Sequence, residues 1–226
     1  MSYILFNLND KLYIKDPQKS EIGKAIISHS IQLVNEVGFE QLTFRKIAEE
    51  MASTEATIYR YFENKFRLLQ YLVDWYWASM SFEIGFQLNN ISNPEEKLRI
   101  CLQLLAGTKS FVHMSPIDLK TLQRIAITEG DKAFLSRSID SDYRNGLLDP
   151  FKDVCGLIAG IVKQINPKYP FAHSLISTAM TAANHQIFFA MHLPILTDIT
   201  NDKKNMNEKL YRFLENFVLN AIKSPA

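Results

Sequence analysis

The side chains with the most recognisable chemistry lie in residues 43–65, and they suit contact with DNA. Small and polar side chains can approach base edges closely and pair with them in the major groove. Tyrosines, arginines and lysines can instead bind phosphate oxygens without reading the base sequence. The candidate residues for these two roles are Thr43, Arg45, Lys46, Thr54, Glu55, Ala56, Thr57, Tyr59, Arg60, Tyr61 and Lys65.

Two short helices are expected to position these residues. Thr43 is a typical N-cap, and apolar residues follow it at helical spacing as far as Met51. Thr54 begins a second helix that runs to Phe62, so residues 52–54 form a three-residue turn. This is the layout of a helix-turn-helix, in which the N-terminal residues of the second helix meet base edges.

The side chains of the second helix fall into groups with different expected roles. Residues 54–57 lie at its N-terminus and face the bases, while Ile58 and Phe62 face inward. Residues 59–61 are then left to contact phosphates. Lys65 opens the next helix, where its cation and the backbone N–H groups can share a phosphate. Each tyrosine or cation alone is equally consistent with ordinary packing or solvation, and only their combination on this frame favours DNA.

Helical periodicity continues outside this region and predicts an all-α fold. The neighbouring helices are expected at residues 20–37, closed by Gly38, and at 65–88. Residues 3–15 are β-prone, which predicts a short extended or hairpin arm before Asp16-Pro17 rather than a disordered tail. Further helices are expected at 94–110, 116–128, 130–139, 147–165, 170–191 and 206–222.

Residues 38–73 resemble the N-terminal signature of the TetR family of bacterial regulators. The likeness covers residues 20–73, and beyond residue 75 only the all-helical character is shared. The positions that match in order and spacing are Gly38-Phe39, Thr43, Ile47-Ala48, Tyr59, Tyr61-Phe62 and Lys65.

The resemblance implies three parts of the chain. They are an N-terminal arm at 1–17, a three-helix DNA-binding domain at 18–66, and a helical ligand-binding and dimerisation domain at 67–226. It also implies a homodimer that reads a palindromic operator, with a small apolar or aromatic ligand relieving repression. The alternative is a TetR-like ligand-binding or adaptor protein whose DNA binding is weak or lost.

Three departures from the family pattern bear on DNA binding. The turn has Ala52 where Gly is usual and Ser53 where an apolar residue is usual, and Ala52 is strained if the turn needs a positive φ. The reading helix begins with Glu55 and Ala56, and Glu55 repels phosphate but can accept from a cytosine amino group. Residues 1–70 hold nine basic and nine acidic residues, and the whole chain has a net charge of +1. Specificity is therefore expected to depend on geometry and dimer spacing more than on charge.

Two apolar stripes in the last two expected helices predict a dimer interface. Each stripe lies on one helix face, so two copies of the chain can form a four-helix contact. The alternative is that both stripes pack into the core of their own subunit. The residues are Ile176, Met180, Ala183, Ile187, Leu210, Phe213, Leu214 and Phe217.

Aromatic residues and histidines of the helical half are candidates for an apolar ligand pocket, with plain core as the alternative. No His, Cys or Asp spacing supports a metal site, and no cofactor is expected. The candidate pocket residues are Trp75, Phe82, Phe86, Phe111, His113, Tyr143, His185 and Phe189.

The remaining features narrow the class of protein. Apolar residues make up 47% and charged residues 22% of the chain, as in ordinary globular proteins. No hydrolase or nucleotide-binding motif is present, so we expect no enzyme. Cys101 and Cys155 have apolar neighbours and are expected to be buried free thiols. No leader peptide and no apolar run of the ~18 residues needed for a membrane span is found, which favours the cytoplasm.

Overall fold

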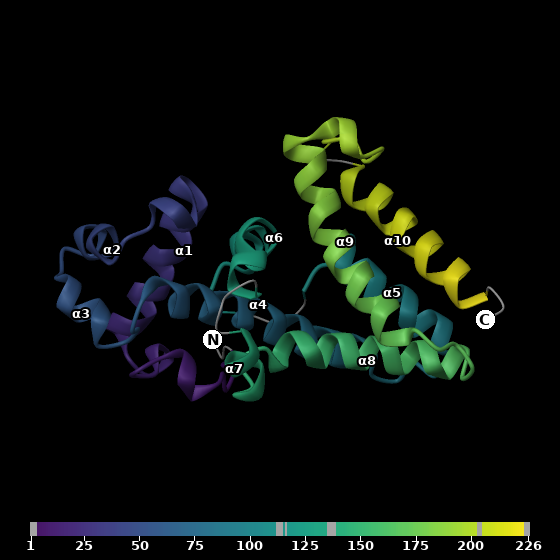
Figure 1. The fold of residues 1–226 in the computed structure, drawn as a ribbon, viewed down its shortest axis with the longest axis horizontal. Helices are drawn as coiled ribbons and strands as arrows, with labels where there is room; N and C mark the ends of the chain where they lie inside the picture. The colour runs from purple at the N-terminus through teal and green to yellow at the C-terminus, as the bar shows by residue number, and fades with distance from the viewer. Residues whose placement is uncertain (1–3, 112–114, 116, 135–138, 203–204, 224–226) are drawn as a thin grey trace. The chain divides into compact units, whose positions relative to one another are not determined.

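A computed structural model describes residues 4–111, 115, 117–134, 139–202 and 205–223, and within these ranges every regular element is helical (Figure 1). The predicted all-α class is therefore confirmed. Three short 3₁₀ helices accompany the α-helices: η1 (Asp10–Leu12), η2 (Pro17–Lys19) and η3 (Pro194–Leu196). The α-helices are α1 (Glu21–Gln41), α2 (Phe44–Glu50), α3 (Glu55–Tyr59), α4 (Lys65–Gln87), α5 (Pro94–Ala106), α6 (Leu119–Phe134), α7 (Ile139–Arg144), α8 (Asp149–Ile165), α9 (Ala172–His192) and α10 (Met206–Lys223).

The chain forms two compact units, each built from two stretches of sequence. Unit 1 comprises Met1–Ser79 and His113–Pro150, and unit 2 comprises Met80–Val112 and Phe151–Ala226. Packing therefore groups α6 and α7 with the helix-turn-helix, although the family resemblance assigns them to a C-terminal domain. Helix α4 begins in unit 1 and ends in unit 2.

The core of unit 1 joins α1–α3 to the first turns of α4. Ile26, Ile47, Ile58, Phe62 and Leu68 come from this region, and their side chains are completely buried. Burying an aliphatic or aromatic side chain of this size stabilises a fold by roughly 1.5–3 kcal/mol. The shared core fixes the orientation of α3 relative to α1.

Helix α1 is interrupted near its C-terminus, close to where the sequence predicts its end. Gly38 has φ 77° and ψ 161°, values outside the helical range, and a single turn then reaches Gln41. Helix α6 packs on this end of α1, where Glu129 accepts from the Phe39 N–H at 3.3 Å. Lys132 of α6 forms an ion pair with Glu40 at 2.9 Å. Helix α6 thus supports the bend that leads into α2.

The described part of the N-terminal arm is extended, as one of the two predicted forms, and it contains the 3₁₀ turns η1 and η2 in place of a hairpin. Leu8 and Leu12 are buried. The Tyr13 ring meets the Tyr71 ring edge-on at 6.0 Å, and the Ile14 N–H donates to the Tyr61 carbonyl at 2.8 Å. The arm is therefore an integral part of unit 1.

Unit 2 is a packed group of helices in which α10 lies against both α9 and α5. Cys101 and Cys155 are both free and buried, as predicted. Burial raises the pKa of the Cys101 thiol to about 12, so this thiol stays neutral and packs as an apolar group. Among the helices that the structure describes, none is long and apolar enough to cross a membrane.

Candidate nucleic-acid interface

Helices α2 and α3 form a helix-turn-helix with the predicted boundaries at their N-terminal ends. Thr43 caps α2, because its hydroxyl accepts from the Lys46 N–H at 3.2 Å. Thr54 occupies the N-cap position of α3, but its side chain makes no capping hydrogen bond. Its hydroxyl instead lies 3.2 Å from that of Thr57, which also accepts from Ser53 at 3.1 Å. A cluster of three hydroxyls therefore stands at the N-terminal end of α3.

The turn between the two helices strains one residue. Ala52 has φ 47°, in the left-handed region that glycine adopts without steric cost. A side chain with a Cβ costs roughly 1–2 kcal/mol in that region. The sequence-based concern about this departure from the family pattern is thus confirmed.

Replacing Ala52 by Gly should stabilise the protein by about 0.5–1 kcal/mol, because relief of the strain exceeds the entropy that glycine loses on folding. The measurement is the midpoint of chemical denaturation. The matched control is Ala56→Gly, at an exposed α3 position, which should lower stability by a similar amount. A destabilised Ala52→Gly protein would contradict the strain at Ala52.

The outer face of α3 holds the residues that can reach DNA. Glu55, Ala56 and Arg60 are exposed, and Thr57 is half-buried. Tyr59 is 51% exposed and meets the Phe44 ring edge-on at 4.8 Å, so its ring is held against α2 while half of its surface stays accessible. The exposed face therefore combines small, acidic, basic and phenolic groups on a helix with fixed orientation.

The cations of α2 lie on the same exposed part of unit 1. Arg45 pairs with Glu49 of its own helix at 2.8 Å, and both side chains are exposed. Lys46 donates to the Gln41 carbonyl at 2.9 Å. Exposed contacts of this kind contribute little to stability, so both cations can exchange them for a phosphate.

Tyr61 and Lys65, which were both predicted to bind phosphate, have partners inside unit 1. Tyr61 is only 3% exposed, and its hydroxyl lies 2.7 Å from the Ser20 hydroxyl, so the prediction is wrong for this residue. The Lys65 ammonium donates to three carbonyls at the end of α1, of Phe39, Glu40 and Leu42, at 3.0–3.2 Å. These bonds use all three donors of an ammonium group. Both residues thus help to position the helix-turn-helix. Tyr61 lies three residues after inward-facing Ile58, and this helical spacing could have predicted from the sequence that Tyr61 is buried.

The candidate pocket residues are divided between the two units. In unit 1, Trp75 is buried while Tyr143 is 55% exposed. In unit 2, Phe82 stacks on Phe86 at 6.4 Å, and His185 stacks on Phe189 at 5.9 Å. Phe111 is half-buried, and His113 lies outside the described residues. A ligand pocket formed by these residues therefore stays a prediction.

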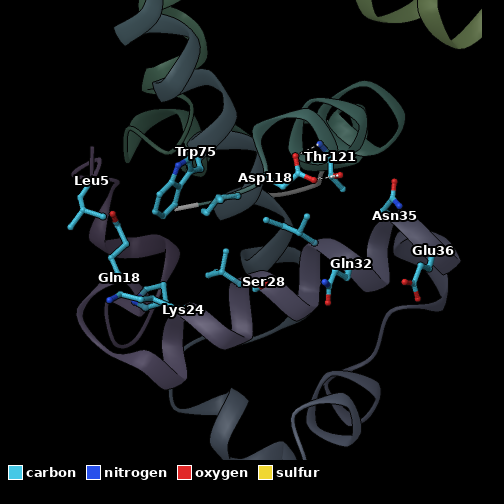
Figure 2. Close-up of a pocket in the computed structure, with 14 residues that line it drawn as sticks. Leu5, Gln18, Lys24, Ser28, Gln32, Asn35, Glu36, Trp75, Asp118 and Thr121 are labelled. Carbon is cyan, nitrogen blue, oxygen red and sulfur yellow. Dashed lines mark hydrogen bonds between the residues drawn. The ribbon is translucent and has the colours of Figure 1, made fainter. Parts of the chain in front are cut away.

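A cavity of about 190 Å³ instead lies in unit 1, beside α1 (Figure 2). Its walls come from α1, from the arm, from the start of α6 and from Trp75 of α4. Sequence reasoning identified Trp75 but none of the α1 residues, because their spacing is that of any amphipathic helix.

The two apolar stripes of α9 and α10 are largely core. Six of the eight residues are buried within unit 2, which matches the alternative reading of the pattern. An apolar stripe indicates that one face of a helix is buried, but it does not show whether the same chain or a second copy covers that face. Phe213 remains 41% exposed and stacks on half-buried Phe217 at 6.2 Å. The buried residues are Ile176, Met180, Ala183, Ile187, Leu210 and Leu214.

No group of three or more metal-ligating side chains occurs among the residues that the structure describes.

Comparisons with known proteins find similarity to bacterial regulators. Residues 26–72 match the profile of the bacterial regulatory proteins of the tetR family. Nucleoid occlusion factor SlmA from Vibrio vulnificus is 28% identical over 91 residues, which are 40% of this chain and 45% of that protein. The match thus spans less than half of the relative's length.

Solved structures share the fold over most of the chain. The fatty acid degradation regulator FadR from Bacillus halodurans has a TM-score of 0.60 and 18% identity, over 87% of this chain and 96% of its own. AibR, solved in complex with isovaleryl coenzyme A and operator DNA, has a TM-score of 0.56 and 16% identity, over 88% and 98%. The family profile thus matches the helix-turn-helix region of this chain, and the solved structures share its all-helical fold.

Proposed function

We propose that this protein is a transcription regulator that binds a specific DNA sequence through α3. The observation that carries the proposal is an exposed α3 face held rigidly by a buried core. Ile58 and Phe62 are completely buried, while Glu55, Ala56 and Arg60 are exposed. A rigid helix with small N-terminal side chains can enter the major groove and contact base edges.

Within this proposal, reading and positioning are assigned to different residues. Thr57 and Glu55 contact bases, because hydroxyl and carboxylate groups accept from the amino groups of adenine or cytosine. Tyr59, Arg60 and the α2 cations bind phosphates and set the register. With few cations available, the affinity should fall with salt less steeply than for strongly basic regulators.

The proposal is tested by selecting binding sequences from a random duplex library, and by fluorescence anisotropy with DNA from upstream of the protein's own coding region. We expect a palindromic site whose half-sites lie about one helical turn apart or a multiple of it, as for other helix-turn-helix dimers. Titration across a salt series separates specific from non-specific binding. The absence of an enriched sequence, even at low salt, would sink the proposal.

Two α3 substitutions should give opposite patterns. Arg60→Ala should weaken binding to all sequences by a similar factor and reduce the salt slope by about one unit. Thr57→Val should change base preference at one position by roughly 1–3 kcal/mol and leave the salt slope unchanged. Both are measured by anisotropy against a panel of single-base variants. If Thr57→Val keeps the wild-type preference, Thr57 does not read bases.

We propose that the protein acts in the cytoplasm as a homodimer, with α10 contributing to the contact. The support is the exposed Phe213 ring stacked on Phe217, since exposed aromatic pairs favour association. Phe213→Glu should weaken dimerisation at least tenfold, measured by analytical ultracentrifugation. The control is Ile195→Glu, at a side chain that is 91% exposed in η3, which should leave the dimer intact. Equal association of both variants would exclude this surface.

Relief of DNA binding by a small apolar or aromatic ligand belongs to the same proposal, which makes the protein a repressor. The likeness to AibR, solved in complex with isovaleryl coenzyme A and operator DNA, supports regulation by a ligand.

The competing function is a TetR-like ligand-binding or adaptor protein that does not bind a specific DNA sequence. The exposed Glu55 at the start of α3 favours that alternative, because a carboxylate repels phosphates. Restoration of tight DNA binding by Glu55→Gln would support it.

A further inference from the structure

We propose that Ser53, in the turn before α3, is a positioning residue that determines which base Thr57 binds. The proposal rests on the proposed reading of DNA by α3, and it adds to that reading a residue from outside the helix. The hydroxyl of Ser53 acts through the side chain of Thr57 and does not itself have to touch DNA. Three features carry the inference: a fixed backbone, a chain of hydroxyl groups and the order of the protons along it.

The turn between α2 and α3 fixes the backbone of Ser53. The Ser53 N–H donates to the carbonyl of Ala48 at 2.8 Å. The N–H of Ala52, whose φ is positive, donates to the carbonyl of Glu49 at 3.1 Å. These two bonds around a left-handed residue form a Schellman motif at the end of α2. Because Ala48 is buried in the core of unit 1, the motif fixes the point from which the Ser53 side chain extends.

Two hydroxyl groups hold the side chain of Thr57 from the preceding turn. Ser53 donates to the Thr57 Oγ1 at 3.1 Å, and the Oγ1 of Thr54 lies 3.2 Å from the same atom. A threonine in a helix divides between two χ1 rotamers. Partners three and four residues earlier in the chain favour the rotamer that directs Oγ1 towards the start of α3. Ser53 and Thr54 are exposed and Thr57 is half-buried, so this hydroxyl chain lies at the surface of α3 that is proposed to read DNA.

The order of the protons along the three hydroxyls selects the kind of base atom that Thr57 contacts. A hydroxyl has one proton to donate and two lone pairs that accept. The Thr54 side chain makes no capping bond, so it can donate its proton to a DNA phosphate oxygen, which only accepts. Thr57 then donates to Thr54, accepts from Ser53 and keeps one lone pair. That lone pair can accept from the exocyclic amino group of adenine or cytosine.

Ser53→Ala removes the hydroxyl and keeps the turn, because the bond to Ala48 comes from the backbone. Thr57 can then adopt its second rotamer. Binding to the selected DNA sequence should weaken roughly threefold to tenfold, which corresponds to the loss of one hydrogen bond. Binding to duplexes changed at the base pair that Thr57 reads should stay the same, and so should the salt slope. General damage to the helix-turn-helix would instead weaken binding to all duplexes by a similar factor.

The measurement is fluorescence anisotropy of the full chain against the selected duplex and its single-base variants. Ser53→Thr keeps a hydroxyl and should restore the wild-type base preference. The double variant Ser53→Ala/Thr57→Val should match Thr57→Val alone, because Ser53 acts only through Thr57. Ser174→Ala, at an exposed serine of α9, is the matched control and should bind as wild type. An equal loss on all duplexes, or additive effects in the double variant, would overturn the proposal.

Base analogues test the order of the protons. The position to change is the base pair at which Thr57→Val alters the preference. A duplex that lacks the exocyclic amino group at this pair should bind the wild-type protein as weakly as the natural duplex binds Thr57→Val. A 7-deazapurine at the same pair, which lacks an acceptor, should bind as tightly as the natural base. The reverse result would show that Thr57 donates to the base and would refute the proposed order.

Side-chain scalar couplings of Thr57 in the DNA-free full chain separate this inference from the proposed function. We expect one χ1 rotamer in the wild type and in Ser53→Thr, and an average over two rotamers in Ser53→Ala. If these rotamers are found but no DNA sequence is selected, the DNA-binding function fails and the positioning of Thr57 by Ser53 stands. If a sequence is selected and Ser53→Ala changes neither the rotamer nor the base preference, the inference about Ser53 alone is refuted.

Discussion

Arg67→Met should lower the free energy of unfolding by about 3 kcal/mol, because it leaves a buried carboxylate without its cation. Asp142 of α7 is completely enclosed, and its Oδ1 accepts from the Arg67 guanidinium at 3.0 Å. Its Oδ2 accepts from the Gln70 amide at 3.0 Å, and Gln70 in turn accepts from Arg67 at 2.8 Å. The network joins α4 to α7 within unit 1, so its loss affects the support of the helix-turn-helix.

The measurement is urea denaturation of the single variants Arg67→Met and Asp142→Asn and of the double variant. The double variant should be more stable than additivity predicts, because a neutral amide at position 142 no longer needs the cation. The control is Arg212→Met, which breaks an exposed ion pair with Glu208 and should change stability by less than about 1 kcal/mol. Equal effects of Arg67→Met and Arg212→Met would show that burial of Asp142 does not matter.

Asp74→Asn should stabilise the protein by an amount that grows with pH. Asp74 lies on α4 with its Oδ2 buried and without a hydrogen-bond partner. Burial, together with the negative charge of Asp149, raises the pKa of Asp74 from 3.8 to about 8. The carboxyl group is therefore protonated in the folded protein at neutral pH and ionised in the unfolded chain.

The direction of the pH dependence follows from the number of bound protons. Between a pH of about 4 and 8, the folded state holds a proton at Asp74 that the unfolded state has lost. Stability therefore falls as pH rises through this window, by up to about 1.4 kcal/mol per pH unit, and is level above it. Asn removes this loss, so the variant should gain nothing near pH 4 and roughly 5 kcal/mol near pH 8.

The comparison is a series of denaturation curves for wild type, Asp74→Asn and Asp153→Asn between these limits. Asp153 is an exposed residue of α8, so its variant should follow the wild-type pH dependence. Parallel curves for wild type and Asp74→Asn would show that Asp74 is ionised in the folded protein.

The sequence predicted the helix-turn-helix accurately because its determinants are local. The Thr43 cap, the three-residue turn and the inward pair of Ile58 and Phe62 all lie within twenty residues, and each depends on neighbours in the chain. The positive φ of Ala52 was anticipated for the same reason, because a family position usually held by Gly had another residue.

The contacts that sequence reasoning missed join residues that are distant in sequence. Lys65 bonds to carbonyls of residues 39–42, and Tyr61 bonds to Ser20, contacts that no spacing rule contains. The apolar spacing of α9 shows that one helix face is buried, but the same spacing would result from burial in its own subunit or against a second copy of the chain. The cavity beside α1 was missed because its walls come from the arm, α1, α4 and the start of α6, which are distant from one another in sequence.

The composition of unit 1 also determines when the reading helix acquires its support during synthesis. Residues 4–79 leave the ribosome first, but α6 and α7 follow only after the 33-residue excursion Met80–Val112 into unit 2. Until then Asp142 is absent and Arg67 and Gln70 have no acid to bind. N-terminal domains commonly fold as they emerge. Here the core of α1–α4 can form early, but its contacts with α6 and α7 form late, so a chain stalled before residue 139 lacks the network around Asp142.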